Sequence, residues 1–264
     1  MIWERLKVVQ KANEVKDDIV TVFQWELVSF VSKYNQQQHV FFIDLNNQIG
    51  HFYYNGNCWS YESLTGFIEG AAPQAGSPLT GFVSEYNQQL HVSFIDANNH
   101  IKQLVYNGNK WGCEDLTAAA NCVPAQVGSA LTSFASEYNQ QQHVIFIDAN
   151  NHIGQMVYDG IALKYEDLTA GAKGATPQAG SALIGFASEG NQQQYVFFVD
   201  ANNYIGEIIY NGENLSYQDL KLLTYEGRMM TGYADGYQPH VFFIDPNNII
   251  SHIIYGLHCE ELIK

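Results

Sequence analysis

The stretch YNQQQHVFFIDLNNQIGHFYYNGNCW, residues 34–59, contains the pattern that decides the fold. Within it, the apolar run at residues 40–43 is followed by Asp44 and an Asn-Asn pair, and a second apolar run leads to an Asn-Gly pair. Short runs of β-branched and aromatic residues bounded by Asn and Gly are typical of strands joined by tight turns. The stretch therefore predicts two antiparallel strands that meet at Asn46-Asn47, with a hairpin turn after the second strand.

The same block recurs along the chain at nearly constant spacing. Its first position is held by His39, His91, His143, Tyr195 and His240, so the first three intervals are 52 residues and the last is 45. A fixed period of this size indicates a repeat architecture. A catalytic group is needed only once, so a His/Asp pair present in nearly every copy indicates a structural role or a series of similar sites, and we assign no catalytic residue.

Each repeat contains four short strand-like segments. In the second repeat these are residues 79–86, 91–96, 100–106 and 111–116, separated by polar turns. When the second and third segments are paired about the Asn-Asn turn, both faces of the hairpin are largely apolar, as in a sheet covered on both sides. Four antiparallel strands per unit suit the blade of a β-propeller. We predict an all-β fold, a five-bladed β-propeller of four-stranded antiparallel blades with about 52 residues per repeat.

The repeats divide the chain into one domain, residues 1–264, with repeats at about 25–78, 79–130, 131–182, 183–228 and 229–264. The signature of the fourth strand occurs once more than a ring of five requires, because both Glu4-Arg5-Leu6 and Glu260-Glu261-Leu262 carry it. We expect residues 1–24 to supply the closing strand and a linker. The surplus strand could pair with another chain and form a homo-oligomer, since an exposed strand edge is a template for pairing.

Charge and hydropathy exclude several classes of partner. The net charge is −15 with only 12 Lys plus Arg, which argues against binding to nucleic acid or to an anionic membrane surface. No apolar run approaches the roughly 20 residues that span a bilayer, and the first residues lack the apolar core of a signal peptide. These features favour a cytoplasmic protein or one released by a non-classical route, and the compartment stays open.

The D-x-N-N turns lack the alternating oxygen ligands and the closing acid of a calcium loop. The aspartates at these turns, Asp44, Asp96, Asp148, Asp200 and Asp245, are instead predicted to bond the backbone of their own turn. We therefore expect neither a metal site nor a cofactor.

The blocks H-V-x-F-I-D-x-N-N-x-I and Y-N-G-x-x-W-x-x-E-D-L-T resemble the repeats of β-propeller lectins, in particular the fungal-type fucose-specific lectins and related bacterial propeller lectins. The resemblance covers about residues 25 to 262. It implies sugar sites between neighbouring blades, where an Arg at the head of the second strand and a Glu twelve residues later hold the sugar hydroxyls and an aromatic side chain packs on its apolar face.

The positions that the resemblance points to are altered in this chain. The Arg position matches His39, His91, His143, Tyr195 and His240, and the Glu position matches His51, Gln103, Gln155, Glu207 and His252. No repeat keeps the Arg, and only Glu207 keeps the acid. Since His lacks the fixed charge and the planar fork of donors that Arg provides, the fucose site is not carried over intact.

The candidate ligand-binding residues are these polar pairs and two tryptophans that follow Asn-Gly turns. They are His39, His51, Trp59, His91, Gln103, Trp111, His143, Gln155, Tyr195, Glu207, His240 and His252. Each Trp offers a large apolar face for a sugar ring. The alternative is structural: the polar pairs would satisfy one another, as buried polar groups must, and the tryptophans would pack in the core.

These observations favour a non-enzymatic, multivalent carbohydrate-binding protein with sites between adjacent blades and with glycans or glycoproteins as partners. A protein-interaction scaffold is the first alternative, because any propeller presents broad faces to partners. The second is an enzyme with a site in the central channel. Only the divergent fifth repeat offers titratable residues for such a site, namely Arg228, Asp235, His240, His252 and His258.

Overall fold

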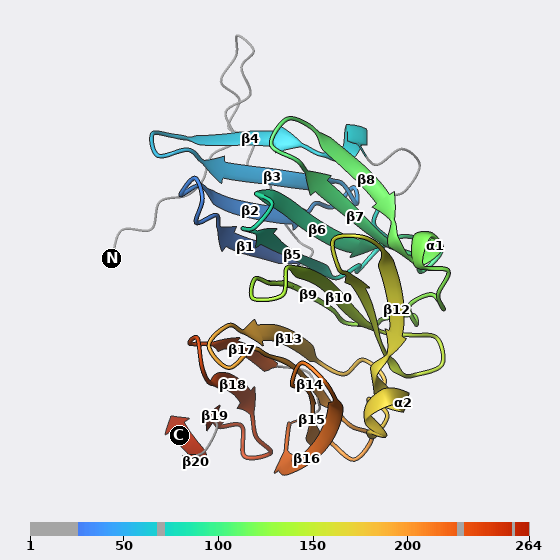
Figure 1. Cartoon of the computed structure of the whole chain (residues 1–264), viewed down its shortest axis with the longest axis vertical. Helices are drawn as coiled ribbons and strands as arrows, with labels where there is room; N and C mark the ends of the chain where they lie inside the picture. Colours follow the sequence, from blue (N-terminus) through green and yellow to red (C-terminus); the bar gives the residue numbers. More distant parts are fainter. Residues whose placement is uncertain (1–25, 68–71, 226–229, 255–256, 264) are drawn as a thin grey trace.

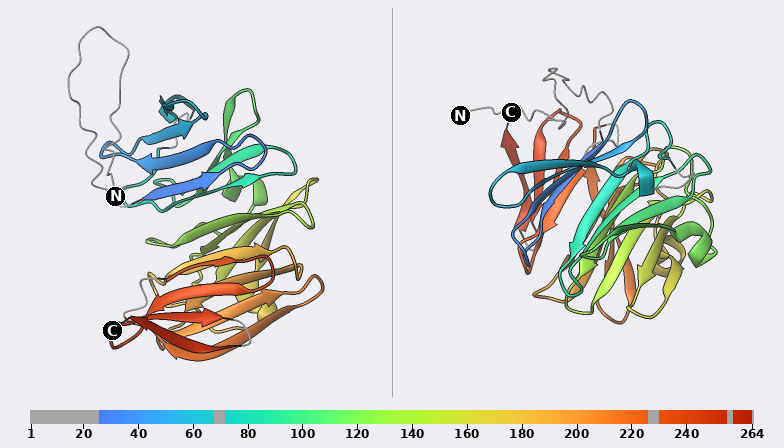
Figure 2. Two further views of the ribbon diagram at one scale, coloured as in Figure 1. Left: turned by 90° about the vertical axis from the view of Figure 1, so that its left-hand side faces the viewer. Right: turned by 90° about the horizontal axis from the view of Figure 1, so that it is seen from above.

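The computed structural model of the protein describes residues 26–67, 72–225, 230–254 and 257–263. In this part of the chain, five antiparallel sheets of four strands follow one another around a ring (Figure 1). Neighbouring sheets contact each other through their first strands, so the first strand of each sheet is innermost and the fourth is outermost. Figure 2 shows the same arrangement from two other sides. The predicted five-bladed β-propeller is confirmed.

The strands recur in the same order in every blade. The first blade contains β1 (Leu27–Val31), β2 (Gln38–Ile43), β3 (Ile49–Tyr54) and β4 (Trp59–Ser63), followed by a 3₁₀ turn, η1 (Thr65–Phe67). The second contains β5 (Leu79–Ser84), β6 (Gln89–Ile95), β7 (Ile101–Tyr106) and β8 (Trp111–Asp115). The third contains β9 (Leu131–Ser136), β10 (Gln141–Ile147), β11 (Ile153–Tyr158) and β12 (Leu163–Asp167). The fourth contains β13 (Leu183–Ser188), β14 (Gln193–Val199), β15 (Tyr204–Tyr210) and β16 (Leu215–Leu223). The fifth contains β17 (Met230–Ala234), β18 (Pro239–Ile244), β19 (Ile250–Ile254) and β20 (Leu257–Ile263).

The turn between the second and third strands of each blade has the predicted construction. The Asp44 carboxylate accepts hydrogen bonds from the backbone N–H groups of Asn46 and Gln48, at 2.8 and 2.9 Å. Asn47 adopts a left-handed conformation with φ of 56°, which Asn tolerates better than most residues. The equivalent aspartates of the other blades make the same pair of bonds, as expected for Asx-turns; they are Asp96, Asp148, Asp200 and Asp245.

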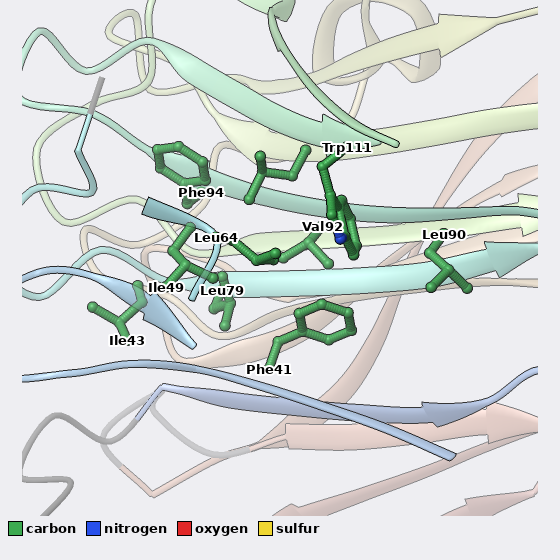
Figure 3. Close-up of a cluster of buried hydrophobic side chains, with 10 residues drawn as sticks. Phe41, Ile43, Ile49, Leu64, Leu79, Leu90, Val92, Phe94 and Trp111 are labelled. Atoms are coloured by element: carbon green, nitrogen blue, oxygen red, sulfur yellow. The ribbon is translucent and has the colours of Figure 1, made fainter. Parts of the chain in front are cut away.

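The turn fixes the register of the hairpin and therefore the two faces of each blade. In the first blade Phe41 lies opposite His51 and Val40 lies opposite Phe52, as the sequence predicts. One face packs against the next blade. The apolar cluster between the first two blades includes Phe41 and Ile49 from one side and Val92 and Trp111 from the other (Figure 3). Similar clusters join the second blade to the third, the third to the fourth and the fourth to the fifth.

A repeated glutamate also links neighbouring blades. The Glu137 carboxylate, which follows β9, accepts hydrogen bonds from the backbone N–H groups of Glu85 and Tyr86 in the preceding blade, at 2.9 and 3.0 Å. Glu85 makes the same pair of contacts to the first blade, and Glu189 makes it to the third. Each carboxylate thus satisfies two donors that a neighbouring turn leaves outside its own sheet.

Two short helices occupy segments that the sequence predicts as plain linkers. They are α1 (Leu116–Ala120) and α2 (Leu168–Ala172), which follow the outermost strands of the second and third blades. Asp115 caps α1 by accepting a hydrogen bond from the backbone N–H of Ala118, and Asn121 ends the helix in a left-handed conformation. An Asp N-cap followed by alanines favours a helical turn even where no helical periodicity exists.

That residues 1–24 supply a closing strand stays a prediction. Among the described residues, the fourth strand of the fifth blade is β20, which contains the C-terminal copy of the signature and pairs with β19. A strand that follows its partner after two residues closes a far shorter loop than one from the other end of the chain, so its pairing costs less entropy. The N-terminal copy, Glu4-Arg5-Leu6, lies outside the described residues.

The seam between the fifth and first blades differs from the other four. Leu27 on β1 is 60% exposed, whereas its equivalent Leu79 on β5 is 7% exposed because the first blade covers it. Tyr233 on β17 is 52% exposed, whereas its equivalent Phe186 is 8% exposed. Among the described side chains no apolar cluster joins these two blades, in contrast to the four other pairs of neighbouring blades.

The described part of the chain contains no helix of the length and hydropathy that crossing a membrane would require.

Candidate functional site between the blades

The predicted polar pairs come together on the face that each blade turns toward the next. Nδ1 of His91 lies 3.1 Å from Oε1 of Gln103, and Nδ1 of His143 lies 3.2 Å from Oε1 of Gln155. The His39–His51 and His240–His252 pairs have the same geometry, with Nδ1 of the first ring 3.0 Å from Nε2 of the second. Pairing of the second and third strands produces these contacts, because it sets the two positions diagonally on one face.

The fourth strand adds a third member to this row that sequence reasoning missed. Pairing of the third and fourth strands sets Glu62 opposite His51, Glu114 opposite Gln103 and Glu166 opposite Gln155. The Glu62 carboxylate lies 2.8 Å from Nδ1 of His51, and the Glu166 carboxylate accepts a hydrogen bond of 3.1 Å from Nε2 of Gln155. The repeated Glu of the E-D-L signature was the available signal, but it had served only to mark the strand.

Burial keeps the histidines of this row neutral. Burial lowers the pKa of His91 to about 4 and that of His143 to about 4, in each case against a smaller opposing effect of the partner Gln. The pKa of His39 also falls to about 4, through burial and then through the charge of His51. Burial lowers the pKa of His51 as well, and its hydrogen bond to Glu62 opposes this. Near neutral pH these rings therefore act through hydrogen bonds rather than through charge.

Two neighbouring seams open into pockets beside this row. A pocket of about 310 Å³ between the second and third blades is lined by His91, Gln103 and Glu114. A pocket of about 510 Å³ between the third and fourth blades is lined by the equivalent His143, Gln155 and Glu166. In each pocket the following blade supplies an apolar wall that includes a leucine at the start of its fourth strand; these are Leu163 and Leu215.

The two tryptophans at that leucine position have different environments. Trp111 is 6% exposed and lies in the seam between the first and second blades, where Nε1 donates a hydrogen bond of 3.0 Å to Glu62 Oε1. Its ring meets those of Phe41 and His51 edge-on, at 5.9 and 5.7 Å between centroids. At the equivalent position in the next two seams a leucine lines a pocket, whereas in this seam the larger Trp111 side chain is buried. Trp59 is 38% exposed, packs on Tyr54 and belongs to the seam between the fifth and first blades.

The fourth and fifth blades carry the variants of the row. Tyr195 and Glu207 are both fully buried, and the Tyr195 hydroxyl reaches Asn191 and Gln193 at the end of the blade. In the fifth blade, His240 Nε2 lies 3.3 Å from the Asp235 carboxylate. The two pockets described above lie in the seams whose row is His, Gln and Glu.

Comparison with solved structures shows that the fold of this chain is similar to that of several lectins. The chain superposes on SapL1 lectin in complex with α-methyl fucoside with a TM-score of 0.67 at 16% identity, over 90% of this chain and 82% of the lectin. A mutant of Aleuria aurantia lectin in complex with Fucα1-6GlcNAc gives 0.69 at 16% identity, over 93% and 80%. AofleA from Arthrobotrys oligospora gives 0.66 at 14% identity, over 92% and 72%.

The remaining comparisons give a weaker similarity or none. A microbial sialidase, Hz136, also superposes, with a TM-score of 0.59 at 10% identity over 90% of this chain and 57% of the sialidase. No family model matches the sequence. No curated protein matches it either. At these identities the superpositions establish the fold alone: the chain has a β-propeller fold similar to that of these lectins.

Proposed function

We propose that the protein is a non-enzymatic lectin that binds glycans in the pockets between its blades. The observation that carries the proposal is the recurrence of one polar row, His, Gln and Glu, beside an open pocket in two successive seams. Such a row supplies several hydrogen-bond donors and acceptors without a fixed positive charge, which suits the hydroxyl groups of a sugar. The apolar wall opposite the row suits the C–H face of the ring.

The fold analogy supports this choice over catalysis. The three lectins named above superpose with TM-scores of 0.66 to 0.69, and two of these structures hold fucosides. A row present in successive blades is suited to repeated binding, whereas catalysis needs one asymmetric group of residues. Because the Arg of the fucose lectins is replaced in every blade, we propose glycan binding without assigning fucose as the sugar.

Repetition of the site would also strengthen binding to a surface that carries many glycans. Two weak sites on one rigid ring would bind a glycan-coated surface with much higher avidity than either site alone. Glycoproteins and glycans are therefore the proposed partners. Pairing of a surplus strand edge with a second copy would multiply the sites further, and light scattering of the purified protein tests this part of the proposal.

A glycan array that includes fucosides, followed by calorimetry, tests the function. We expect glycan binding by the wild type and its loss in the double variant Gln103→Met, Gln155→Met, which keeps the side-chain volume but removes the amides. Gln48→Met, on an exposed turn outside the row, is the matched control. Absence of binding to any glycan would refute the proposal, and sugar-independent recovery of one protein partner would favour a scaffold.

A further inference from the structure

Hydrogen bonds in the third blade fix which ring nitrogen of His143 carries its proton. The Glu166 carboxylate can only accept, so the Gln155 group 3.1 Å away must be the donating amide nitrogen. The Gln155 oxygen then faces His143 Nδ1 at 3.2 Å and can only accept, so Nδ1 carries the proton. His143 is neutral, which leaves Nε2 with a lone pair. The carboxylate on the outermost strand thus sets the polarity of the whole row.

The accepting nitrogen is the unsatisfied end of this chain of bonds. Nε2 of His143 is fully buried and has no hydrogen-bond partner among the described residues. His143 itself belongs to the wall of the 510 Å³ pocket between the third and fourth blades. Phe134 stacks on its ring at 4.7 Å, which holds the imidazole plane. A ligand that enters the pocket can reach Nε2 only if His143 or a neighbouring side chain shifts, and the buried acceptor would then gain the partner that it lacks.

Hydrogen bonds fix the position of the histidine proton in the first blade in the same way, whereas those in the second blade do not. In the first blade the Glu62 carboxylate orients His51, and His51 Nε2 accepts from His39 Nδ1, so His39 Nε2 is again a lone pair. In the second blade the Gln103 amide nitrogen meets the Ser93 hydroxyl at 3.1 Å. Because a hydroxyl can either donate or accept, it does not lock the Gln103 amide. The second blade is therefore an internal control.

The charged residues that line the same pocket also affect which ligand it can accept. Its lining includes Asp159, Lys164, Glu166, Asp167 and Glu213. Lys164 is paired with Asp159 at 2.5 Å, and Asp167 is occupied by His152 and by the N-terminus of α2. Glu166 and Glu213 form no close ion pair in the described part of the chain, although Lys164 attracts Glu166 at longer range. Two such carboxylates repel an anionic ligand.

We propose that the pocket between the third and fourth blades selects sugars that are neutral or carry an amine, and rejects sugars that carry a carboxylate. The reasons are that His143 Nε2 accepts a hydrogen bond and that Glu166 and Glu213 line the pocket. The inference rests on the proposed lectin function and gives it a ligand class. It also inverts the polarity that an arginine, which can only donate, would give at the position of His143.

The test uses the full chain with ¹⁵N-labelled histidine and two matched sugar series, glucose with glucosamine and glucuronic acid, and galactose with galactosamine and galacturonic acid. Ring ¹⁵N shifts, assigned by the signal lost in His143→Asn, report which nitrogen carries the proton. We expect a proton on Nδ1, a shift of Nε2 when a neutral or amino sugar binds, and uronic acids that bind about tenfold or more weakly.

Glu166→Gln is the informative variant, because a Gln can donate as well as accept and carries no charge. We expect it to populate both ring tautomers and to reduce the discrimination against uronic acids severalfold, whereas Glu114→Gln in the neighbouring pocket leaves the His143 signal unchanged.

Uronic acids that bind as tightly as neutral sugars, or a proton on Nε2 of the wild type, would overturn the inference while leaving the lectin function standing. If no sugar of either series binds or shifts the His143 signal, while the array detects glycans elsewhere on the protein, the inference fails; if no glycan binds at all, the function fails with it.

Discussion

Trp111 Nε1 donates a hydrogen bond of 3.0 Å to Glu62 Oε1 across the seam between the first and second blades. The indole fills the part of this seam that, two seams further on, is a pocket beside Leu215. One side chain thus distinguishes a filled seam from an open one, and the difference can be engineered in both directions.

Trp111→Leu should open the first seam. Loss of the buried indole and its hydrogen bond should reduce the free energy of unfolding by about 2–4 kcal/mol, within the range seen for buried aromatic truncations. The widened seam would expose the His39, His51 and Glu62 row, so calorimetry should detect one additional sugar site. An unchanged stoichiometry with the expected loss of stability would show that the row cannot bind without further changes.

Leu163→Trp is the reciprocal change. Leu163 lines the 310 Å³ pocket, so an indole at this position has room and should occupy it as Trp111 does in its own seam. We expect one sugar site fewer and little loss of stability in urea titrations. Retention of every site would contradict the assignment of this pocket to binding.

Acid should destabilise the protein through its buried histidines. Burial places the folded-state pKa of His91 and His143 at about 4, below the unfolded value of 6.5. Between these values the unfolded state binds more protons, so the free energy of unfolding rises with pH from about 4 to 6.5 and falls on acidification through that window. Each ring contributes up to about 3 kcal/mol.

Urea unfolding at several pH values across this window measures the effect. His143→Gln removes one of the titrating groups and should flatten the pH dependence by about the share of one ring. An unfolding free energy that stays constant from pH 6.5 to 4, or a variant as pH-dependent as the wild type, would contradict the burial of a neutral imidazole.

The glutamate link between blades can be tested at Glu137. Both carboxylate oxygens accept backbone hydrogen bonds from the second blade, so Glu137→Gln leaves one of the two N–H groups facing the amide nitrogen, which cannot accept. We expect a loss of about 1–2 kcal/mol. Glu114→Gln, on an exposed strand position, is the control, and equal effects for the two variants would argue against the link.

The seam between the fifth and first blades gives a paired comparison between equivalent leucines. Leu79→Ser should cost about 3 kcal/mol because the first blade covers this side chain, whereas Leu27→Ser should cost less than about 0.5 kcal/mol. Urea midpoints measure both. A large loss for Leu27→Ser would show that this face is covered in solution.

Much of the fold could be read from the repeat. The period, the Asx-turn at Asp44 and the alternation around it were sufficient to predict the blade, its register and the pairing of His91 with Gln103, because these depend on local pattern. The sequence could not decide which strand closes the ring, because two copies of one signature compete and sequence pattern does not rank them; among the described residues the C-terminal copy forms β20. The short helix at residues 116–120 was missed because one capped turn has no measurable periodicity.

The sequence predicted only some of the residues that form the candidate site. Glu62, Glu114 and Glu166 join the row through pairing of the third and fourth strands, and a motif that marks a strand does not reveal which face its acid occupies. Trp59 is partly exposed and Trp111 is buried, although both follow an Asn-Gly turn. Their burial depends on which neighbouring blade covers them, a tertiary property that similar local sequences do not reveal.

The most direct test of the lectin assignment is a crystal of the full chain soaked with the best ligand from the glycan array. We expect sugar density in the seam between the third and fourth blades, with a hydroxyl or amine at hydrogen-bond distance from His143 Nε2 and the ring against Leu215. Density only in the central channel or on the end loops, with this pocket empty at saturating sugar, would contradict it.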